Sequence, residues 1–571
     1  MCGIYSFLNI ESISNMEALK HNFYKGQKRG PEHSAWKRIS EFNIIVGFHR
    51  LAINGLNPES SQPLMIDDCL LICNGEIYNY NKLYETFPVN TARTNSDCEI
   101  IIHMYKKYGI EYTLNNLDGV FAFILLDTTK NTLFVSRDPY GVRPLYQLYN
   151  TEQNPAITGF ASELKQLSEI KAISGLGQRI TKRPPCCDIQ QFTPGTYSTF
   201  VLDNDDWCFH DSRKYSCFGF YTMPTSTEYN TILKMIRENF INAVKKRVVG
   251  TTDRPIACLL SGGLDSSLVT SIVSSMVPNL ETYSIGLPGS EDLKYARQVA
   301  SFLSTNHHQI TVTEDELFDA IPHVIYNIES YDTTTVRASV GNYLVAKFIA
   351  ENSDAKVIFN GDGSDELMGG YLYFHAAEND MEFDKECKRL LSDIHYFDVL
   401  RSDRSISSNG LEPRTPFLDR SWVEFYLSIP KNLRCHGLHK KCEKYLIREA
   451  FNAANLEEKT EEYLPESILF RTKEAFSDGV SSIQKSWHQI IDEKVKTRLP
   501  ANTHELFELY KNKHNPPKTL EQLYYRLLFD GHFPKCETTI PYFWMPRFVE
   551  ATDSSARTLK MYKEINYQTE I

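Results

Sequence analysis

The first third of the chain alternates short apolar runs with polar turns. Runs rich in β-branched and aromatic residues begin at Ile44, Cys69 and Val120, and the last of them leads through the turn "TTKN" into a further run. This composition with such turns predicts paired strands. A helical pattern intervenes between Ser96, a candidate N-cap, and Gly109, a candidate stop. We therefore predict sheets that are covered by helices.

The pattern changes in the middle of the chain. Between about Gly195 and Tyr229 it fades into a polar, aromatic-rich stretch, which we interpret as the connection between two domains. A helical pattern follows, and then strands and helices alternate, which predicts a parallel sheet with helices on both faces. The predicted strands begin at Ile256, Thr282, His307 and Lys356. Beyond about Arg389 the pattern is mainly helical.

Composition and charge exclude several classes of protein. With 571 residues, of which 42% are hydrophobic and 23% charged, the chain is expected to fold into at least two domains. The net charge of −11 argues against a general binder of nucleic acid or anionic membranes. The longest apolar run is far shorter than the ~20 residues of a membrane helix. The thirteen cysteines form no C-x-x-C pair and no zinc-type cluster, so we expect a reducing compartment and a cytoplasmic location.

Cys2 is the first candidate for chemistry. Removal of Met1, which a small second residue permits, would place a thiol and a free α-amine on the same residue. An α-amine titrates at about pH 7.7 to 8.0 and a thiol at about 8.5, so the amine can act as the base for the thiol. On these letters alone, an incidental cysteine at a frayed chain end remains an alternative.

A strand, a loop rich in glycine and serine, and a helix follow one another at "LLSGGLDSS", residues 259–267. Gly262 and Gly263 let the backbone approach a phosphate, the serines supply hydroxyl groups, and the helix N-terminus supplies N–H donors. The loop therefore predicts a polyphosphate site. Asp265 is unfavourable beside a bare phosphate, which implies a bridging Mg²⁺. A simple turn between strand and helix is the alternative.

A second loop, "NGDGSDE", also follows a strand and carries three acids, Asp362, Asp365 and Glu366. Ligands collect beyond the carboxyl ends of parallel strands, so we expect the two loops to face one site. A solvated acidic turn is the alternative. Arg337 and Lys473 are further candidates for binding an anion, although a lone cation is more often a surface residue.

Motifs spread over residues 2 to about 560 resemble one family. The first half contains "MCGI", "RGPE", "HRLAI", "NGEIYN", "DPYGVRPLY" and "ASELKQL", and the second contains "LLSGGLDSS", "GLPGSEDL", "NGDGSDE", "PRTPFLD", "RTKEAFSDGV" and "ATDSSARTL". The first set resembles a class II glutamine amidotransferase domain. The second resembles the synthetase half of the glutamine-hydrolysing asparagine synthetases. The number and order of these motifs favour Cys2 as a nucleophile.

The resemblance implies a fold and a reaction. Residues 2–200 would form a four-layer αββα N-terminal-nucleophile hydrolase domain and 201–227 a connection. Residues 228–571 would form an ATP-pyrophosphatase-like domain with a parallel sheet and a helical C-terminal part. The implied reaction makes L-asparagine from L-aspartate through a β-aspartyl-AMP intermediate, with ammonia from L-glutamine, and releases AMP, pyrophosphate and L-glutamate. ATP and Mg²⁺ are the implied co-substrate and cofactor, and a homodimer is left open.

The resemblance also assigns residues to a glutamine site. Cys2 would attack the side-chain amide of glutamine, and Asn74 and Gly75 would form the oxyanion hole. Arg50 would bind the α-carboxylate of glutamine. The α-ammonium would be bound by Glu76 and Asp97. The backbone around this pocket would come from Leu51, Ala52, Ile53 and Asn54.

In the second half the resemblance implies a nucleotide site. Adenine would lie against Leu259 and Ile285, ribose or the α-phosphate near Asn360 and Gly361, and pyrophosphate on the first loop. The implied ATP-binding residues are Leu259, Ser261, Gly262, Gly263, Asp265, Ser266, Ile285, Asn360 and Gly361. Those implied for the other roles are Asp265 and Asp365 for Mg²⁺, Arg337 for aspartate, Lys473 for phosphate, and Asp362 as the catalytic carboxylate.

Three stretches depart from the family pattern. Asp362 replaces a more usual Glu, Glu32 of "RGPE" replaces a commoner Asp, and "RASVGNYL" replaces a more usual R-A-S-T-P-M stretch near the implied aspartate pocket. Other hypotheses are a related amide synthetase such as a β-lactam-forming enzyme, a glutamine phosphoribosylpyrophosphate amidotransferase, and a sensing protein without catalysis. Cys2, Arg50 and Asp97 argue against the first, and "SGGLDSS" argues against the second. The intact nucleophile and phosphate loop argue against the third.

Overall fold

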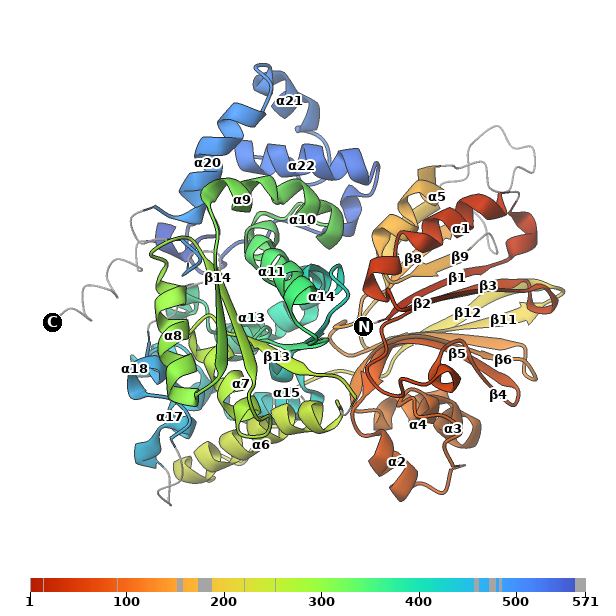
Figure 1. Cartoon of the computed structure of the whole chain (residues 1–571), viewed down its shortest axis with the longest axis horizontal. Coiled ribbons are helices and arrows are strands. Elements are labelled where there is room, and N and C mark those ends of the chain that lie inside the picture. Colours follow the sequence, from red (N-terminus) through yellow and green to blue (C-terminus); the bar gives the residue numbers. More distant parts are fainter. Residues whose placement is uncertain are drawn as a thin grey trace.

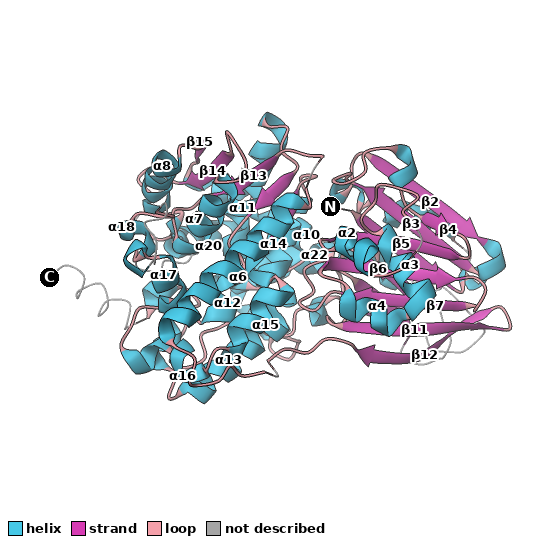
Figure 2. Ribbon diagram, turned by 90° about the horizontal axis from the view of Figure 1, so that it is seen from below, coloured by secondary structure: helices cyan, strands magenta, loops and turns pink. Residues whose placement is uncertain are grey.

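The computed structural model places an antiparallel half and a parallel half side by side (Figure 1). It describes residues 2–13, 15–89, 91–150, 158–172, 187–219, 221–251, 253–455, 462–471, 479–481 and 485–559. Figure 2 shows the strands of the first half stacked together and the helices of the second half gathered around its sheet. Within the described part of the chain, no helix has both the length and the apolar character that a membrane span requires.

Two six-stranded antiparallel sheets form the first half. One sheet has the order β10 (Cys187–Gln191), β8 (Tyr146–Asn150), β9 (Thr158–Ala161), β1 (Gly3–Leu8), β3 (Ile44–Arg50) and β2 (His33–Ile39). The other has the order β12 (Asp206–Lys214), β11 (Thr196–Asp203), β7 (Thr132–Arg137), β6 (Gly119–Asp127), β5 (Cys69–Ile77) and β4 (Leu64–Ile66). The strands predicted from Ile44, Cys69 and Val120 are β3, β5 and β6, and the turn "TTKN" joins β6 to β7 as predicted.

The two sheets face each other, and helices cover both outer faces. Ile4 and Val46 of the first sheet pack in one buried cluster with Ile72 and Ile124 of the second. The helices on the first sheet are α1 (Met16–Tyr24) and α5 (Ser168–Ala172), and those on the second are α2 (Tyr80–Thr86), α3 (Glu99–Tyr108) and α4 (Ile110–Asn116). The four-layer αββα arrangement is therefore confirmed. The helix predicted from Ser96 is α3, which ends at Gly109 as expected but begins after Cys98.

A hairpin of β11 and β12 occupies part of the stretch that we predicted as a connection. Asp203 pairs with Asp206, and the two turn residues Asn204 and Asp205 both have positive φ, 49° and 67°. Asn and Asp tolerate this conformation, and a two-residue turn of this kind matches the twist of the flanking strands. Most of β12 is not buried, so its polar side chains gave no alternating pattern. The segment outside the sheets therefore begins later than residue 201.

The second half contains a five-stranded parallel sheet. Its order is β15 (Asn306–Thr311), β14 (Glu281–Gly286), β13 (Ile256–Leu259), β16 (Val357–Phe359) and β17 (Glu412–Arg414). The four predicted strands are present, and β17 was not predicted because it has only three residues, one of them proline. The candidate phosphate loop follows β13, and the acidic loop follows the neighbouring strand β16. Because these two strands pair in parallel, both loops lie at the same edge of the sheet.

Helices cover both faces of this sheet, as predicted. On one face Ala257 and Ile358 pack with α10 (Ile321–Ile328) and α11 (Thr333–Asn352). On the other face Cys258 and Phe359 pack with α6 (Tyr229–Val249), α7 (Leu264–Ser274) and α8 (Glu291–Leu303). The other described helices of this half are α9 (Glu314–Asp319), α12 (Ser364–Met368), α13 (Asp380–Asp393), α14 (Asp398–Ser407), α15 (Arg420–Ser428), α16 (Lys431–Arg434), α17 (Tyr445–Phe451), α18 (Glu466–Leu469), α20 (Trp487–Arg498), α21 (Thr503–Tyr510) and α22 (Leu520–His532).

Candidate active sites

Cys2 lies at the start of β1, at the buried face between the two antiparallel sheets. Its backbone N–H donates to Asn74 Oδ1 at 3.2 Å, and its thiol contacts the carbonyl oxygen of Leu51 at 3.6 Å. Burial raises the pKa of the Cys2 thiol to about 11, and the positive amino terminus partly opposes this shift. A buried thiol needs a base beside it to become a nucleophile.

Asn74 and Gly75 lie on β5, beside Cys2. Asn74 is fully buried, and its Nδ2 has no hydrogen-bond partner within the described residues. A buried amide without an acceptor is costly, so this donor is explained best by a ligand oxygen that binds there. A Cβ at position 75 would lie 2.5 Å from the carbonyl oxygen of Val120, so only glycine fits. The predicted oxyanion pair and the predicted nucleophile are therefore neighbours.

The residues predicted for the glutamine pocket surround this point. Arg50 is buried and donates to the carbonyl oxygens of Gly55 and Asn57, which holds the loop that follows β3. The Asn54 carboxamide donates to Glu76 Oε2 at 2.8 Å. Asp97 Oδ2 accepts a hydrogen bond of 2.7 Å from a β5 backbone N–H. Burial raises the pKa of Glu76 well above its usual range, and the neighbouring Asp97 carboxylate raises it further.

Asp97 leads to a prediction about pH. Burial raises the pKa of Asp97 to about 6. Only the carboxylate form attracts an ammonium group, so a ligand ammonium at this position should bind more weakly as the pH falls through about 6. We expect calorimetric glutamine binding by the Cys2→Ala variant to weaken from about pH 8 to about pH 5. Adding Asp97→Asn should make binding weak at every pH, and an unchanged pH profile in that double variant would contradict the assignment.

The loop after β3 is also fixed to the second half of the chain. Glu32 Oε2 accepts a hydrogen bond of 2.8 Å from the backbone N–H of Ala52, and Glu32 Oε1 forms an ion pair with Arg254 at 2.5 Å. The Asn54 carboxamide donates to the carbonyl oxygen of Gly250 at 3.0 Å. Glu32, whose departure from the family pattern had no explanation in the sequence, therefore joins the candidate glutamine loop to the other half.

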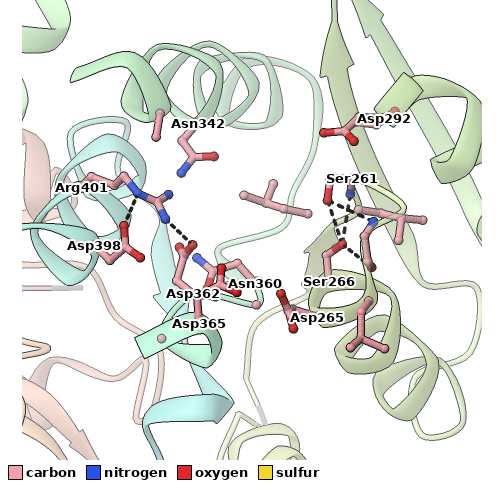
Figure 3. A pocket seen from close by; sticks show the side chains of 18 of the residues that line it. Ser261, Asp265, Ser266, Asp292, Asn342, Asn360, Asp362, Asp365, Asp398 and Arg401 are labelled. Atoms are coloured by element: carbon pink, nitrogen blue, oxygen red, sulfur yellow. Dashed lines mark hydrogen bonds and ion pairs between the residues drawn. The ribbon is translucent and has the colours of Figure 1, made fainter. Parts of the chain in front are cut away.

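A cavity at the carboxyl edge of the parallel sheet is lined by both loops (Figure 3). Gly361 of the second loop approaches the first so closely that a Cβ would lie 2.8 Å from the Cβ of Asp265. The two loops therefore face one site, as predicted. Gly262 does not line the cavity but turns the first loop with a φ of 72°. The predicted residues that line the cavity are Leu259, Ser261, Gly263, Asp265, Ser266, Ile285, Asn360, Gly361, Asp362 and Asp365.

The sequence did not predict Lys444, which lies between the two carboxylates assigned to Mg²⁺. Its Nζ donates to both oxygens of Asp265, at 2.8 and 2.7 Å, and forms an ion pair with Asp365. Lys444 has a φ of 58°, a conformation that side chains rarely adopt and that clusters at functional sites. Only glycine fits at Gly370, where a Cβ would lie 2.0 Å from Asp365 Oδ1. The two carboxylates thus converge on one point, which the Lys444 ammonium occupies and which a metal ion could take only if the lysine moved away.

Arg401 on α14 holds the predicted catalytic carboxylate. Its Nη2 donates to Asp362 Oδ1 at 2.9 Å, and its Nε donates to Asp398 Oδ1 at 2.9 Å (Figure 3). The other oxygen of Asp362, Oδ2, is buried and has no hydrogen-bond partner among the described residues. Asp362 is therefore fixed by one oxygen and faces a ligand position with the other. Sequence reasoning missed Arg401 because the arginine lies in a helix outside the recognised motifs.

Arg337 and Lys473 differ from the other predicted residues. Arg337 is buried, but its guanidinium binds Glu521 and Asp553 and contacts His488, and it does not line the cavity. These three partners lie close enough together to suit a metal ion, but the arginine already supplies the positive charge there. In the structure Arg337 therefore joins α11 to the C-terminal segment, and its contact with aspartate stays a prediction. Lys473 lies outside the described residues.

Buried charged residues join the two sites. Arg29 Nε donates to the carbonyl oxygen of Cys2 at 3.1 Å, and Arg29 Nη1 donates to Asp403 on α14 at 2.7 Å. Next to it on α14, Ser402 accepts a hydrogen bond of 2.8 Å from Asn360 of the second loop. Helix α14 therefore contacts the loop of the second site directly and reaches Cys2 through Arg29. Apolar residues of both halves also pack in one cluster, including Leu51, Ile53 and Val142 of the first half and Leu260 and Phe417 of the second.

The fold and the two sites define a class of protein. Cys2 lies in the αββα half, beside the Asn74 amide, whose Nδ2 has no partner among the described residues. A strand-loop-helix unit, the candidate phosphate site, lies in the attached parallel-sheet half. Two such sites in one chain are typical of an amidotransferase with a second, synthetase site. A family model described as a glutamine amidotransferase domain matches residues 1–199. A second model, described as asparagine synthase, matches residues 235–384 and 376–539.

Relatives match almost the whole chain. The asparagine synthetase [glutamine-hydrolyzing] of Gallus gallus is 40% identical over 590 residues, and that of Homo sapiens is 39% identical over 591, each covering 99% of both chains. Among solved structures, a glutamine phosphoribosylpyrophosphate amidotransferase of B. subtilis matches 50% of this chain and 66% of its own chain, at 16% sequence identity. Its TM-score is 0.29, which is a low structural similarity. The chain belongs to the family of glutamine-hydrolysing asparagine synthetases.

Proposed function

We propose that this chain makes L-asparagine from L-aspartate and ATP, using ammonia that it releases from L-glutamine. The activated aspartate is β-aspartyl-AMP, and the other products are L-glutamate, AMP and pyrophosphate. One observation supports this function more than any other. A partly buried cysteine lies beside an amide donor that has no partner among the described residues, and Arg29 and helix α14 link it to the cavity of the phosphate loop.

Hydrolysis of glutamine would begin at Cys2. Its thiol gives its proton to the α-amine and attacks the side-chain carbonyl carbon of glutamine. Asn74 Nδ2 and the Gly75 N–H then bind the oxyanion, and donors of this kind contribute roughly 2.7 to 4 kcal/mol each. Collapse of the tetrahedral intermediate releases ammonia and leaves a thioester, which water hydrolyses to glutamate. Arg50 would bind the glutamine α-carboxylate, and Glu76 with Asp97 would bind the α-ammonium.

The cavity of the second half would bind ATP. Adenine would lie against Leu259 and Ile285, which line the cavity, and the pyrophosphate would lie on the loop that precedes α7, where the helix N-terminus supplies N–H donors. Asp265 and Asp365 would hold Mg²⁺, which would neutralise phosphate charge. Lys444, whose ammonium now joins these two carboxylates, would then turn to a phosphate oxygen.

Formation of the amide would take place beside Asp362. The β-carboxylate of aspartate attacks the α-phosphate of ATP and displaces pyrophosphate. Ammonia then attacks the acyl carbon and displaces AMP, while Asp362 accepts the proton that ammonia loses. Ammonia would cross from Cys2 along α14, in a passage that we infer to be lined partly by apolar residues of both halves. The predicted domain limits, the cytoplasmic location and the homodimer stay predictions.

Product analysis tests this function. The purified chain is incubated with glutamine, aspartate, ATP and Mg²⁺, and the amino acids and nucleotides are identified. We expect asparagine, glutamate, AMP and pyrophosphate in equal amounts. Formation of ADP and phosphate, or of an amide other than asparagine, would show a different synthetase.

The role of the α-amine predicts the mass of the mature protein. A peptide bond to Met1 would remove the basic amine from Cys2, and the thiol would then have no base beside it. We therefore expect intact-mass analysis of glutamine-dependent protein to show a chain without Met1. Full glutamine-dependent activity in a preparation that retains Met1 would contradict this mechanism.

A further inference from the structure

One face of α11 forms a wall of the nucleotide cavity. Thr334, Ala338, Asn342 and Val345 line the cavity, and their spacing of four, four and three residues places them along one side of the helix. Ala338 and Val345 are apolar, so they offer shape but no hydrogen bond. The two polar residues of this face therefore decide what it can recognise, and Asn342 is the one nearer the middle of the helix.

Asn342 has an unused carboxamide. The residue is only 5% exposed, and its side chain makes no hydrogen bond with any described residue. Figure 3 shows the carboxamide pointing into the cavity, on the same side as Arg401. Its amide atoms face the open cavity, where a ligand could accept and donate hydrogen bonds. Asn342 is therefore best explained as a ligand contact.

The cationic side chains that line the cavity form two groups: Lys444, Arg448 and Arg471 on one hand, and Arg401 on the other. Lys444 binds the carboxylates of the phosphate region, Arg448 binds Glu443, and Arg471 binds Asp292. Arg401 lies across the cavity from the phosphate loop (Figure 3).

Arg401 has one nitrogen left for a ligand. Its Nε is bound to Asp398 and its Nη2 to Asp362, which fixes the plane of the guanidinium. No described residue accepts a hydrogen bond from its Nη1. Arg401 is therefore the cation of this cavity that can receive a carboxylate at the end away from the phosphates.

We propose that Asn342 and Arg401 together bind the α-carboxylate of the aspartate substrate, and that Asn342 is a specificity-determining residue. This inference rests on the proposed function. Asn342 Nδ2 and Arg401 Nη1 would each donate to the carboxylate. The α-ammonium would face Asp362 Oδ2, which has no hydrogen-bond partner in the described part of the chain. The β-carboxylate would then point toward the phosphate loop. The α-carboxylate of aspartate would thus face the positive charge of Arg401, and its α-ammonium would face the negative charge of Asp362.

Two departures from the family pattern meet in this subsite. Asn342 stands where the more usual R-A-S-T-P-M stretch has Met, and Asp362 stands where Glu is more usual. Both residues line the same cavity. The shorter acid places its carboxylate about one methylene farther from a ligand, and the amide, which is also smaller than Met, supplies a hydrogen-bond donor that Met lacks. We infer that the two departures compensate each other.

Removal of the amide tests the contact. Asn342→Leu keeps the approximate shape of the side chain but has no donor, and Asn342→Gln keeps the donor. Pyrophosphate release is measured against aspartate and against ATP. We expect Asn342→Leu to raise KM for aspartate about 10- to 100-fold, the effect of one hydrogen bond to a charged group, with KM for ATP changed less than about two-fold. Asn342→Gln should lose less.

Substrate analogues test which group of aspartate Asn342 recognises. Succinate keeps both carboxylates of aspartate, and 3-aminopropanoate lacks the α-carboxylate. As competitive inhibitors, succinate should lose affinity for Asn342→Leu, and 3-aminopropanoate should bind this variant as it binds the parent. An equal loss for both analogues, an unchanged KM for aspartate, or a rise only in KM for ATP would overturn the inference. A parent chain that releases no pyrophosphate with aspartate would overturn the proposed function instead, and glutaminase activity checks that each variant is folded.

A double-mutant cycle tests the compensation. Asn342→Met and Asp362→Glu each restore the more usual residue at one position. If the departures compensate, the double variant should have a kcat/KM for aspartate at least about five-fold above the product of the two single effects. Independent, multiplicative effects would show that the two positions are not coupled.

Discussion

Replacement of Cys2 by alanine is expected to abolish glutamine-dependent asparagine formation and to leave ammonium-dependent formation near the parent rate. The thiol is the only group in this account that attacks glutamine, so its loss removes the ammonia source. The cavity of the second half contains no atom of Cys2, so synthesis from added ammonium salts should continue. Asparagine is measured with each nitrogen source in turn.

The control for this variant is Cys217→Ala. Cys217 is an exposed cysteine and should tolerate the same change without loss of either activity. Loss of both activities in a well-folded Cys2→Ala protein would contradict the view that the two sites work separately. Retention of glutamine-dependent activity would show that another residue is the nucleophile.

The second large effect is expected at Asp362. Asp362→Asn should reduce asparagine formation from ammonia by roughly 10² to 10⁴, the usual contribution of a general base. Asp362→Glu should retain much of the activity, because Arg401 can still hold one oxygen of the longer carboxylate. The loss on Asp362→Asn should appear in kcat with ammonia as the nitrogen source, together with a rise in KM for aspartate, because Asp362 Oδ2 would also face the α-ammonium. Glutaminase activity should change little in either variant.

Glu366→Gln is the comparison for Asp362→Asn. Burial raises the pKa of Glu366 well above its usual range, and its Oε1 accepts a hydrogen bond from Tyr371, so a neutral side chain already suits this position. We therefore expect the Gln variant to stay active. If Asp362→Asn makes asparagine at the parent rate, the catalytic carboxylate is misassigned, and Asp365 or Glu366 becomes the better candidate.

The fold could be predicted well where the signal is local. The buried strands β3, β5 and β6 are rich in β-branched and aromatic residues, and β13 and β16 are apolar strands followed by glycine-rich loops. The second strand of the hairpin was missed because its side chains are mostly exposed and polar. Strand β17 was missed because three residues with a proline give no pattern, and only its parallel pairing with β16 makes it a strand.

The residues of the candidate sites could likewise be predicted where the signal is local in the sequence and were missed where it is not. Cys2, Asn74 and the two loops lie in short motifs, so the sequence indicated them. Arg401 and Lys444 lie far along the chain from the carboxylates that they bind, and only the tertiary fold brings them together. Arg337 lies in a recognised motif, but its motif did not indicate that it binds acids of the C-terminal segment. Its contact with aspartate stays a prediction.

The central claim is that one chain transfers nitrogen from glutamine at Cys2 to an activated aspartate in the second half. The most direct test supplies glutamine labelled with ¹⁵N in its amide, together with aspartate, ATP, Mg²⁺ and an excess of unlabelled ammonium. We expect the side-chain amide of asparagine to carry ¹⁵N at an enrichment far above that of the ammonium in solution. One glutamate should form for each labelled asparagine. Asparagine whose amide carries only the isotope ratio of the free ammonium would contradict the central claim.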